Sequence, residues 1–213
     1  MIQKPIVMID FETTGLSPAM GDRVTEVAAL RIVGGRVTER YVSLINCGAR
    51  IPSFITSLTG ISQDMVDNAP PVSRVIPDLL DFIGSDMLSA HNASFDEKFL
   101  KAESERLGLA TGHTGLVCSL KLSRRIFPGM PSYKLGQLSG QLGIRFRSAA
   151  HRAESDAEVA AEVLSHIGKH LGATYRLPSV EPHLLVSVNK LAAAKVPAWL
   201  HKYAQENTAP QVA

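Results

Sequence analysis

The sequence predicts an α/β fold in which a mixed central β-sheet is flanked by helices. Two observations indicate this class. Two stretches with β-branched residues, at 24–33 and 36–44, flank Gly34-Gly35, a two-residue turn signal typical of an antiparallel hairpin. After this hairpin, short apolar strands alternate with segments whose apolar residues recur at helical spacing. A hairpin followed by alternating strands and helices is typical of a mixed sheet covered by helices.

The remaining elements have local signals of their own. Residues 5–11 form an apolar, β-branched run that predicts a buried first strand. Residues 72–83 follow two prolines and carry apolar residues at helical spacing, which predicts a helix. Ser94 and Glu97 form a capping-box pattern at the start of another expected helix. The further expected elements are strands near 87–90 and 117–118 and helices near 94–107, 119–126, 135–142 and 153–170.

The composition is that of an ordinary globular chain. It has 213 residues, 45% of them hydrophobic and 20% charged, and a formal net charge of +2. Cys47 and Cys118 are isolated in the sequence, so neither a disulfide framework nor a zinc site is indicated. The apolar run before Asp10 is too short for a signal peptide, and no segment approaches a membrane span. A cytoplasmic location without membrane contact is therefore expected.

Two carboxylates project together from the first expected strand. Asp10 and Glu12 are alternate residues, so they point to the same face, roughly 6–7 Å apart along the chain. Like charges at the end of a core strand repel each other and lose hydration. A divalent cation such as Mg²⁺ removes both penalties, because hard ions take carboxylate oxygens as ligands. The alternative is that the strand has emerged into solvent and both acids are hydrated.

Two further acids and a histidine lie at the starts of expected helices. Asp96 falls in the first turn after the strand near 87–90, at a strand-to-helix switch where α/β sheets place ligands. Asp156 lies near the start of the helix at 153–170, and His151 lies in the loop before it. A rigid acid and a histidine on a loop suit a metal ligand and a proton acceptor. The alternatives are acids that complement helix dipoles and solvated surface groups.

The four acids and the histidine together fit metal-assisted phosphodiester hydrolysis. Two metals about 3.5–4 Å apart can clamp the attacking and leaving oxygens of a phosphoryl transfer, given several carboxylates and one base. The sequence has no glycine-rich phosphate loop, no GxSxG elbow and no CxxC or HExxH pattern. Other common hydrolytic and phosphate-binding sites are therefore not indicated.

The order of these residues resembles the DEDD superfamily of 3′–5′ exonucleases, in its histidine-containing, DnaQ-like branch. The first family motif is matched by Asp10-Phe11-Glu12-Thr13-Thr14-Gly15. The second and third motifs are matched by His91, Asn92 and Asp96 and by His151 and Asp156. Between the first two motifs, a segment similar to the one that lies beside the terminal nucleotide is Leu58-Thr59-Gly60-Ile61-Ser62. The match covers roughly residues 5–172.

The resemblance implies a ribonuclease H-like fold and an enzyme that releases nucleoside 5′-monophosphates from 3′ ends. It implies that two divalent ions, Mg²⁺ or Mn²⁺, are bound by Asp10, Glu12, Asp96 and Asp156. His151 would be the general base, so activity is expected to fall on the acid side as the imidazole becomes protonated. The positions implied around the terminal nucleotide are Phe11, Thr13, Thr14, Leu16, Leu58, Thr59, Asn92 and Phe95. For Phe95, ordinary helix core is the alternative.

The motifs leave the polymer open between DNA and RNA. The Leu-Thr-Gly segment and the later Ala69-Pro70 look more like the polymerase III epsilon group, which favours 3′ ends of single-stranded DNA. The alternatives are an exoribonuclease of the ribonuclease T or oligoribonuclease type and a non-catalytic nucleic-acid-binding module. A basic cluster flanks the third motif and either contacts phosphates or is solvated surface: Lys121, Arg124, Arg125, Lys134, Arg145, Arg147 and Arg152.

Residues 173–213 lie beyond the resemblance and are expected to form a C-terminal helical extension to an exonuclease domain of residues 1–172. Pro182 opens one expected helix and Pro197 a second, shorter one, followed by a frayed tail. The extension either packs back on the domain or docks a polymerase or another protein partner.

Overall fold

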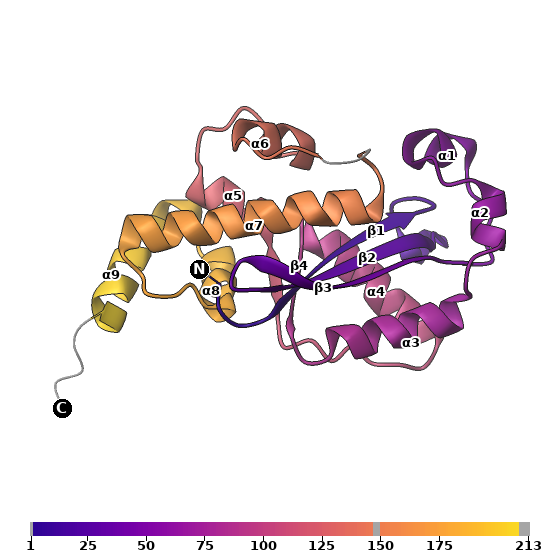
Figure 1. The fold of residues 1–213 in the computed structure, drawn as a ribbon, viewed down its shortest axis with the longest axis horizontal. Helices are drawn as coiled ribbons and strands as arrows, with labels where there is room; N and C mark the ends of the chain where they lie inside the picture. Colours follow the sequence, from indigo (N-terminus) through magenta and orange to yellow (C-terminus); the bar gives the residue numbers. More distant parts are fainter. Residues whose placement is uncertain (1, 147–149, 209–213) are drawn as a thin grey trace.

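A mixed β-sheet runs through the centre of the molecule (Figure 1). The computed structural model describes residues 2–146 and 150–208. In this part of the chain the strands are β1 (Ile6–Thr13), β2 (Val24–Val33), β3 (Arg36–Leu44), β4 (Met87–Ala90) and β5 (Leu116–Cys118). Their order is β3-β2-β1-β4-β5, antiparallel from β3 to β1 and parallel from β1 to β5. The predicted mixed sheet is therefore confirmed.

The hairpin predicted at Gly34-Gly35 has the predicted bounds. Gly34 and Gly35 have φ values of 61° and 74°. Both central residues of a type I′ turn require this left-handed conformation, which glycine adopts without a Cβ clash. Val33 pairs directly with Arg36 across the turn, so the two glycines set the register in which β3 meets β2.

Helices cover both faces of the sheet. They are α1 (Ser53–Thr59), α2 (Gln63–Asp67), α3 (Val72–Ile83), α4 (Ala93–Arg106), α5 (Ser119–Ile126), α6 (Leu135–Gln141), α7 (Ala153–Tyr175), α8 (Pro182–Lys190) and α9 (Val196–Thr208), with short 3₁₀ turns η1 (Pro18–Met20) and η2 (Ala193–Lys195). The predicted helices are present, and α7 continues beyond its predicted end. The short helices α1 and α2 were not predicted. Among the described residues, no helix is long and apolar enough to cross a bilayer.

α4 begins one residue earlier than predicted. Its N-cap is Asn92, which has a φ of 79° and makes no side-chain capping bond. Ser94 consequently lies inside the first turn, and the expected capping box with Glu97 is wrong. Asparagine adopts the left-handed conformation more readily than most residues. Asn92 can therefore make the sharp turn from β4 into the helix that carries Asp96.

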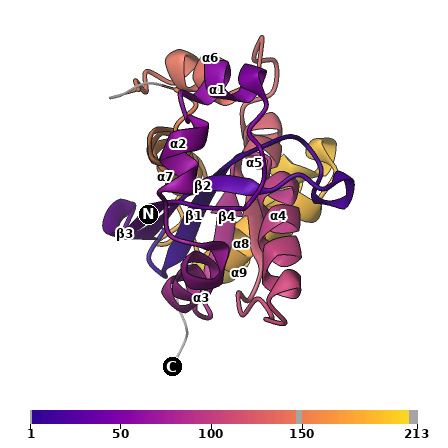
Figure 2. The same ribbon diagram turned by 90° about the vertical axis from the view of Figure 1, so that its right-hand side faces the viewer.

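The sheet separates two hydrophobic clusters, one on each face. Ile6 and Met8 of β1 pack in the cluster that contains α7, whereas Val7 and Ile9 pack in the cluster that contains α3 and α4. The alternation reflects the two-residue period of a strand. Figure 2 shows α3 and α7 on opposite sides of the sheet. The even-numbered residues of β1 therefore face α7.

The residues beyond α7 pack back on the same core. Leu184 of α8 and Leu200 of α9 are fully buried in the cluster that contains α7. The Asn189 side chain accepts a hydrogen bond from the Cys118 N–H at 2.7 Å and donates one to the Cys118 carbonyl at 3.2 Å. It therefore occupies the outer edge of β5, where a further strand would otherwise pair. The domain boundary near residue 172 stays a prediction.

Replacing Asn189 by Leu is expected to lower the free energy of unfolding by about 1–3 kcal/mol, because the Cys118 peptide groups lose both partners. Asn207→Leu is the matched control, since the Asn207 amide makes only an exposed bond within α9. The control should change the free energy of unfolding by less than about 0.5 kcal/mol. Urea unfolding measures both. Equal stabilities for Asn189→Leu and the wild type would show that the sheet edge does not depend on this contact.

Candidate active site

The period of β1 directs two carboxylates toward α7. Ile6 and Met8 are buried on the α7 face, and Asp10 and Glu12 continue that face as partly exposed side chains. β1 extends to Thr13, two residues past its predicted end, so Glu12 as well as Asp10 lies within the strand. Backbone pairing with β2 fixes the position of both acids, whereas β4 pairs with β1 only from Ile6 to Met8.

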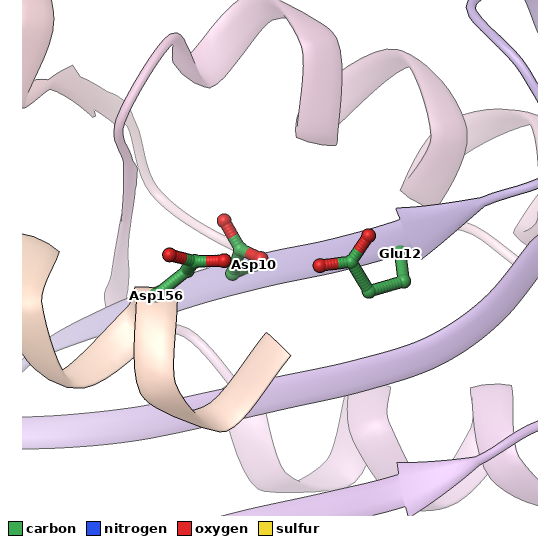
Figure 3. A group of neighbouring side chains, drawn as sticks. All are labelled: Asp10, Glu12 and Asp156. Atoms are coloured by element: carbon green, nitrogen blue, oxygen red, sulfur yellow. The ribbon is translucent and has the colours of Figure 1, made fainter. Parts of the chain in front are cut away.

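α7 brings a third carboxylate to the same place. Asp156 lies in the first turn of α7. Carboxylate oxygens of Asp10, Glu12 and Asp156 all lie within 4.8 Å of one another (Figure 3). The Asp156 Oδ2 also accepts a hydrogen bond from the backbone N–H of His151 at 2.8 Å. The first and third sequence motifs thus meet directly, as predicted.

Asp96 lies beside this acid group but is not among the three residues whose oxygens converge. It is 3% exposed, in the first turn of α4. Its Oδ1 accepts a hydrogen bond from the backbone N–H of Phe11 at 3.2 Å. That bond ties α4 to β1 at the residue between Asp10 and Glu12. The second motif therefore supplies an acid next to the group, with one oxygen already used by the backbone.

Burial and mutual repulsion favour the protonated forms of these acids. Burial raises the pKa of Asp10 well above its usual value, and the charges of Asp96, Asp156 and Glu12 raise it further. Burial, then the charges of Asp156 and Glu26, raises the pKa of Glu12 to about 8. Burial raises the pKa of Asp96 to about 8 and also raises that of Asp156. Arg152 and His151 oppose these pKa shifts for Glu12 and Asp156 but do not cancel them. Converging oxygen donors whose repulsion is not balanced fit a hard divalent cation.

His151 lies beside the acids at a cleft. The cleft has a volume of about 430 Å³, and its lining includes Asp10, His91, Lys134, His151 and Asp156. The His151 side chain is exposed, and its φ of 63° turns the chain just before α7 begins. The predicted base is therefore close to the acids and open to solvent.

His91 also lines this cleft and contacts two neighbouring segments through its ring nitrogens. Its Nδ1 lies 2.9 Å from the Ser119 hydroxyl oxygen, and its Nε2 lies 2.9 Å from the carbonyl oxygen of Tyr133. Burial lowers the pKa of His91. The neutral ring can donate one N–H to the carbonyl and accept from the hydroxyl. His91 thus links the start of α5 to the segment that leads into α6.

The positions predicted to surround a terminal nucleotide fall into two groups. Leu16 and Leu58 are 78% and 51% exposed, and Asn92 is exposed as well. The buried positions are Phe11, Thr13, Thr14 and Thr59. The Phe11 side chain packs in the cluster on the α3 and α4 side of the sheet, away from the acids. Phe95 is partly buried and contacts Phe99, with 5.0 Å between ring centroids. All eight nucleotide contacts stay predictions.

The loop after β1 is held in one shape by close contacts. Asp22 accepts a hydrogen bond from the Ser17 N–H at 2.9 Å. A Cβ at Gly15 would lie 2.4 Å from the Asp22 Oδ1, so any larger residue would displace the Asp22 carboxylate. The Lys98 ammonium donates a hydrogen bond to the Leu16 carbonyl at 2.5 Å. These contacts restrain the backbone around Leu16, and the Leu16 side chain points into solvent.

Glu26 is a site residue that the sequence analysis missed. It pairs with Glu12 across β1 and β2 and is 3% exposed. The Arg152 guanidinium donates to both of its carboxylate oxygens, at 3.1 and 2.5 Å, and the Ala153 N–H donates at 2.9 Å. Glu26 thereby holds the start of α7 against the sheet. An acid inside the apolar strand at 24–33 was the available signal, because a buried acid needs a partner.

Comparisons with known proteins agree with this geometry. The family model described as Exonuclease, RNase_T, matches residues 7–164. The chain is 41% identical over 159 residues to the 3′-5′ exonuclease DinG of Bacillus subtilis (strain 168), covering 75% of the chain and 17% of that protein. It is 31% identical over 175 residues to DNA polymerase III subunit epsilon of Aquifex aeolicus (strain VF5), covering 82% of the chain and 86% of that subunit.

Solved structures share the ribonuclease H-like exonuclease fold. Exonuclease X in complex with 5′ overhanging duplex DNA has a TM-score of 0.66 at 24% identity, covering 86% of this chain and 99% of that one. E. coli Exonuclease I in complex with a dT13 oligonucleotide has a TM-score of 0.70 at 17% identity, covering 82% and 43%. The chain belongs to the exonuclease family. It spans only 17% of DinG and 11% of a DNA polymerase III PolC-type relative.

Glu26→Gln is expected to lower the free energy of unfolding by about 1–3 kcal/mol, because the Arg152 guanidinium and the Ala153 N–H lose a charged acceptor. Unfolding should be measured near pH ~5, where acids with a raised pKa hold their protons and their repulsion does not offset the loss. Glu105→Gln, at an exposed position of α4, is the matched control. If Glu26→Gln is as stable as the control, Glu26 does not stabilise the start of α7.

Without metal, stability should fall as pH rises from about 4 to about 8. The folded-state pKa values of Glu12 and Asp96 are raised to about 8, so the folded state binds more protons than the unfolded state in this window. A divalent ion should reverse the trend, because it binds the ionised acids. Thermal unfolding with EDTA and with Mg²⁺ or Mn²⁺ across this range measures both effects. A metal-free melting temperature that does not fall between these pH values would contradict the raised pKa values.

Proposed function

We propose that the chain is a metal-dependent 3′-5′ exonuclease that removes nucleoside 5′-monophosphates from the 3′ ends of single-stranded DNA. The observation that carries the proposal is the convergence of three carboxylates from β1 and α7 within 4.8 Å, with His151 at the same cleft. Membership of the exonuclease family supports the reaction type.

The acids are assigned as metal ligands in this proposal. Asp10, Glu12 and Asp156 would hold the ions directly, and Asp96 would add its remaining oxygen beside Asp10. When bound, two divalent ions, Mg²⁺ or Mn²⁺, supply a nucleophile and stabilise charge on the transferring phosphoryl group. The backbone pairing of β1 and the Glu26 contact to α7 keep these carboxylates in place.

His151 is assigned as the general base. Its exposed imidazole lines the cleft beside Asp10 and Asp156 and can take a proton from the attacking water. The bond from its backbone N–H to Asp156 fixes the turn that presents the ring. Leu16 and Leu58, both exposed, are assigned to the base and sugar of the terminal nucleotide. Phe11, Thr13, Thr14, Thr59, Asn92 and Phe95 complete the proposed surroundings.

DNA is the favoured polymer because the related proteins include DNA polymerase III subunits, and one solved exonuclease holds a dT13 oligonucleotide. RNA is the second candidate, because another solved structure with a TM-score of 0.67 is a 3′-exonuclease that recognises a histone mRNA stem-loop. A cytoplasmic location is part of the proposal. So is a polymerase or other protein partner, which would meet the faces of α8 and α9 that do not pack on the core.

The first test is degradation of 5′-labelled single-stranded DNA and a matched RNA with Mg²⁺ or Mn²⁺. We expect a ladder that shortens from the 3′ end, faster on DNA. Asp10→Asn and EDTA should each abolish it, whereas Asp81→Asn, an exposed acid of α3, should not. Asn keeps the shape of the Asp10 side chain and adds no charge to the acid group, so the variant is expected to stay folded, which urea unfolding checks. No ladder on either polymer would refute the proposal in favour of a binding module.

His151→Gln should lower kcat by about 10²–10⁴-fold, because the cleft loses its base. The wild-type rate should fall on the acid side, while the residual rate of the variant should follow a different pH profile. Single-turnover rates between about pH 5 and 9 measure both profiles, with His183→Gln on the exposed surface of α8 as the control. A wild-type rate that stays flat down to about pH 5 would exclude His151 as the base.

A further inference from the structure

Basic residues are unevenly distributed along the chain. Residues 106–153 contain eight Lys or Arg and no Asp or Glu. The rest of the chain holds the other 14 basic residues and all 20 acidic ones. The small net charge of +2 therefore conceals a strongly positive segment, which contains β5, α5 and α6 and ends where α7 begins.

Most cations of this segment have no carboxylate partner within residues 2–146 and 150–208. Arg106 and Arg152 pair with Glu103 and Glu26. Arg147 lies outside the described residues. Arg125 donates to the backbone carbonyls of Leu191 and Lys121. The cations that are exposed and outside any ion pair found in the described chain are Lys121, Arg124, Lys134 and Arg145.

Contacts lead from the cleft to the first three of these cations. Lys134 lines the cleft itself. The guanidinium carbon of Arg124 lies 5.9 Å from the centre of the ring of Tyr133, the residue before Lys134. Lys121 is three residues before Arg124 on α5, so both lie on one side of that helix. Lys134 at the cleft is thus linked through Tyr133 to Arg124 and Lys121 on α5.

The fourth cation, Arg145, follows α6 in the sequence, whereas Lys134 precedes it. Arg145 directly precedes Phe146, which lines the same cleft as Lys134. The bond from His91 to the Tyr133 carbonyl fixes the segment that carries Lys134 relative to α5. The surface formed by Lys121, Arg124, Lys134 and Arg145 is called here the α5–α6 basic face.

We propose that the α5–α6 basic face binds the phosphate backbone of the substrate strand behind its 3′-terminal nucleotide. This inference rests on the exonuclease function proposed above. Exposed Lys and Arg that are free of acids can neutralise phosphates and release their counterions. Without bound metal the acid group repels phosphates, so attraction for the strand then has to come from residues beside it. The basic face meets this need because it begins at Lys134, in the cleft that contains Asp10.

The test compares two double neutralisations. Lys121→Gln/Arg124→Gln removes two cations of the face that do not line the cleft. Arg36→Gln/Lys169→Gln is the matched control, because both residues are exposed and line a different groove between β3 and α7. On α7, Lys169 lies on the order of 20 Å from Asp156 along the helix axis. Urea unfolding confirms that both variants are folded.

Binding of a labelled twelve-nucleotide oligothymidylate is measured by fluorescence anisotropy in EDTA, so that no cleavage occurs, between about 50 and 200 mM salt. Each contact to a single strand contributes about 0.7 to the slope of log affinity against log salt. Lys121→Gln/Arg124→Gln should therefore reduce the slope by about 1.4, and the control should leave it unchanged. In the presence of metal, KM for this oligomer should rise while kcat stays close to that of the wild type.

Slopes that are equal for the wild type and Lys121→Gln/Arg124→Gln would overturn the proposal and mark the face as ordinary solvated surface. Equal losses in both double variants would also overturn it, because the effect would then be one of net charge. Failure of the proposed exonuclease function can be distinguished from failure of the basic-face proposal. A wild type that cleaves neither polymer but shows the expected slopes would retain the basic face as a binding surface for single strands.

Discussion

Repulsion among neighbouring carboxylates is the constraint on which the rest of this structure depends. Asp10, Glu12 and Asp156 converge, Asp96 is adjacent, and Glu26 adds a further acid across the sheet. Such a group would spread apart on a flexible chain. It is held because β1 pairs with β2 as far as Thr13 and because each sheet face is covered by its own apolar cluster. Arg152 forms its ion pair with Glu26, the acid that anchors α7, and its charge does not cancel the raised pKa of Glu12. The converging acids are left for another cation.

Much of this arrangement could be predicted from local patterns. The alternation along β1, the two glycines of the hairpin and the helical spacing at 72–83 each act over a few residues, so the sequence alone indicates them. The same holds for the acids, because their positions on a strand and in first helical turns follow from local structure. The structure brings them together from elements far apart in the chain.

The features that the sequence analysis missed depend on contacts with distant parts of the chain, on an unusual backbone conformation or on very short helices. α1 and α2 are too short to show a periodic pattern. The start of α4 depends on the left-handed conformation of Asn92, which the Ser94 and Glu97 pattern does not reveal. Glu26 acquires its role only when α7 is placed over β2. The near-neutral net charge does not reveal the basic segment at residues 106–153, because an average over the chain hides the separation of acids from bases.

The amide of Asn189 at the edge of β5 also bears on how the chain is made. The exonuclease match ends at residue 164, whereas Asn189 and the buried leucines of α8 come later in the sequence. During synthesis, the sheet and α7 are therefore complete in sequence before their last covering is available. In that interval, β5 exposes peptide groups that can pair with a second nascent chain. The order of the chain therefore makes the cover of this sheet edge the last part of the fold to become available.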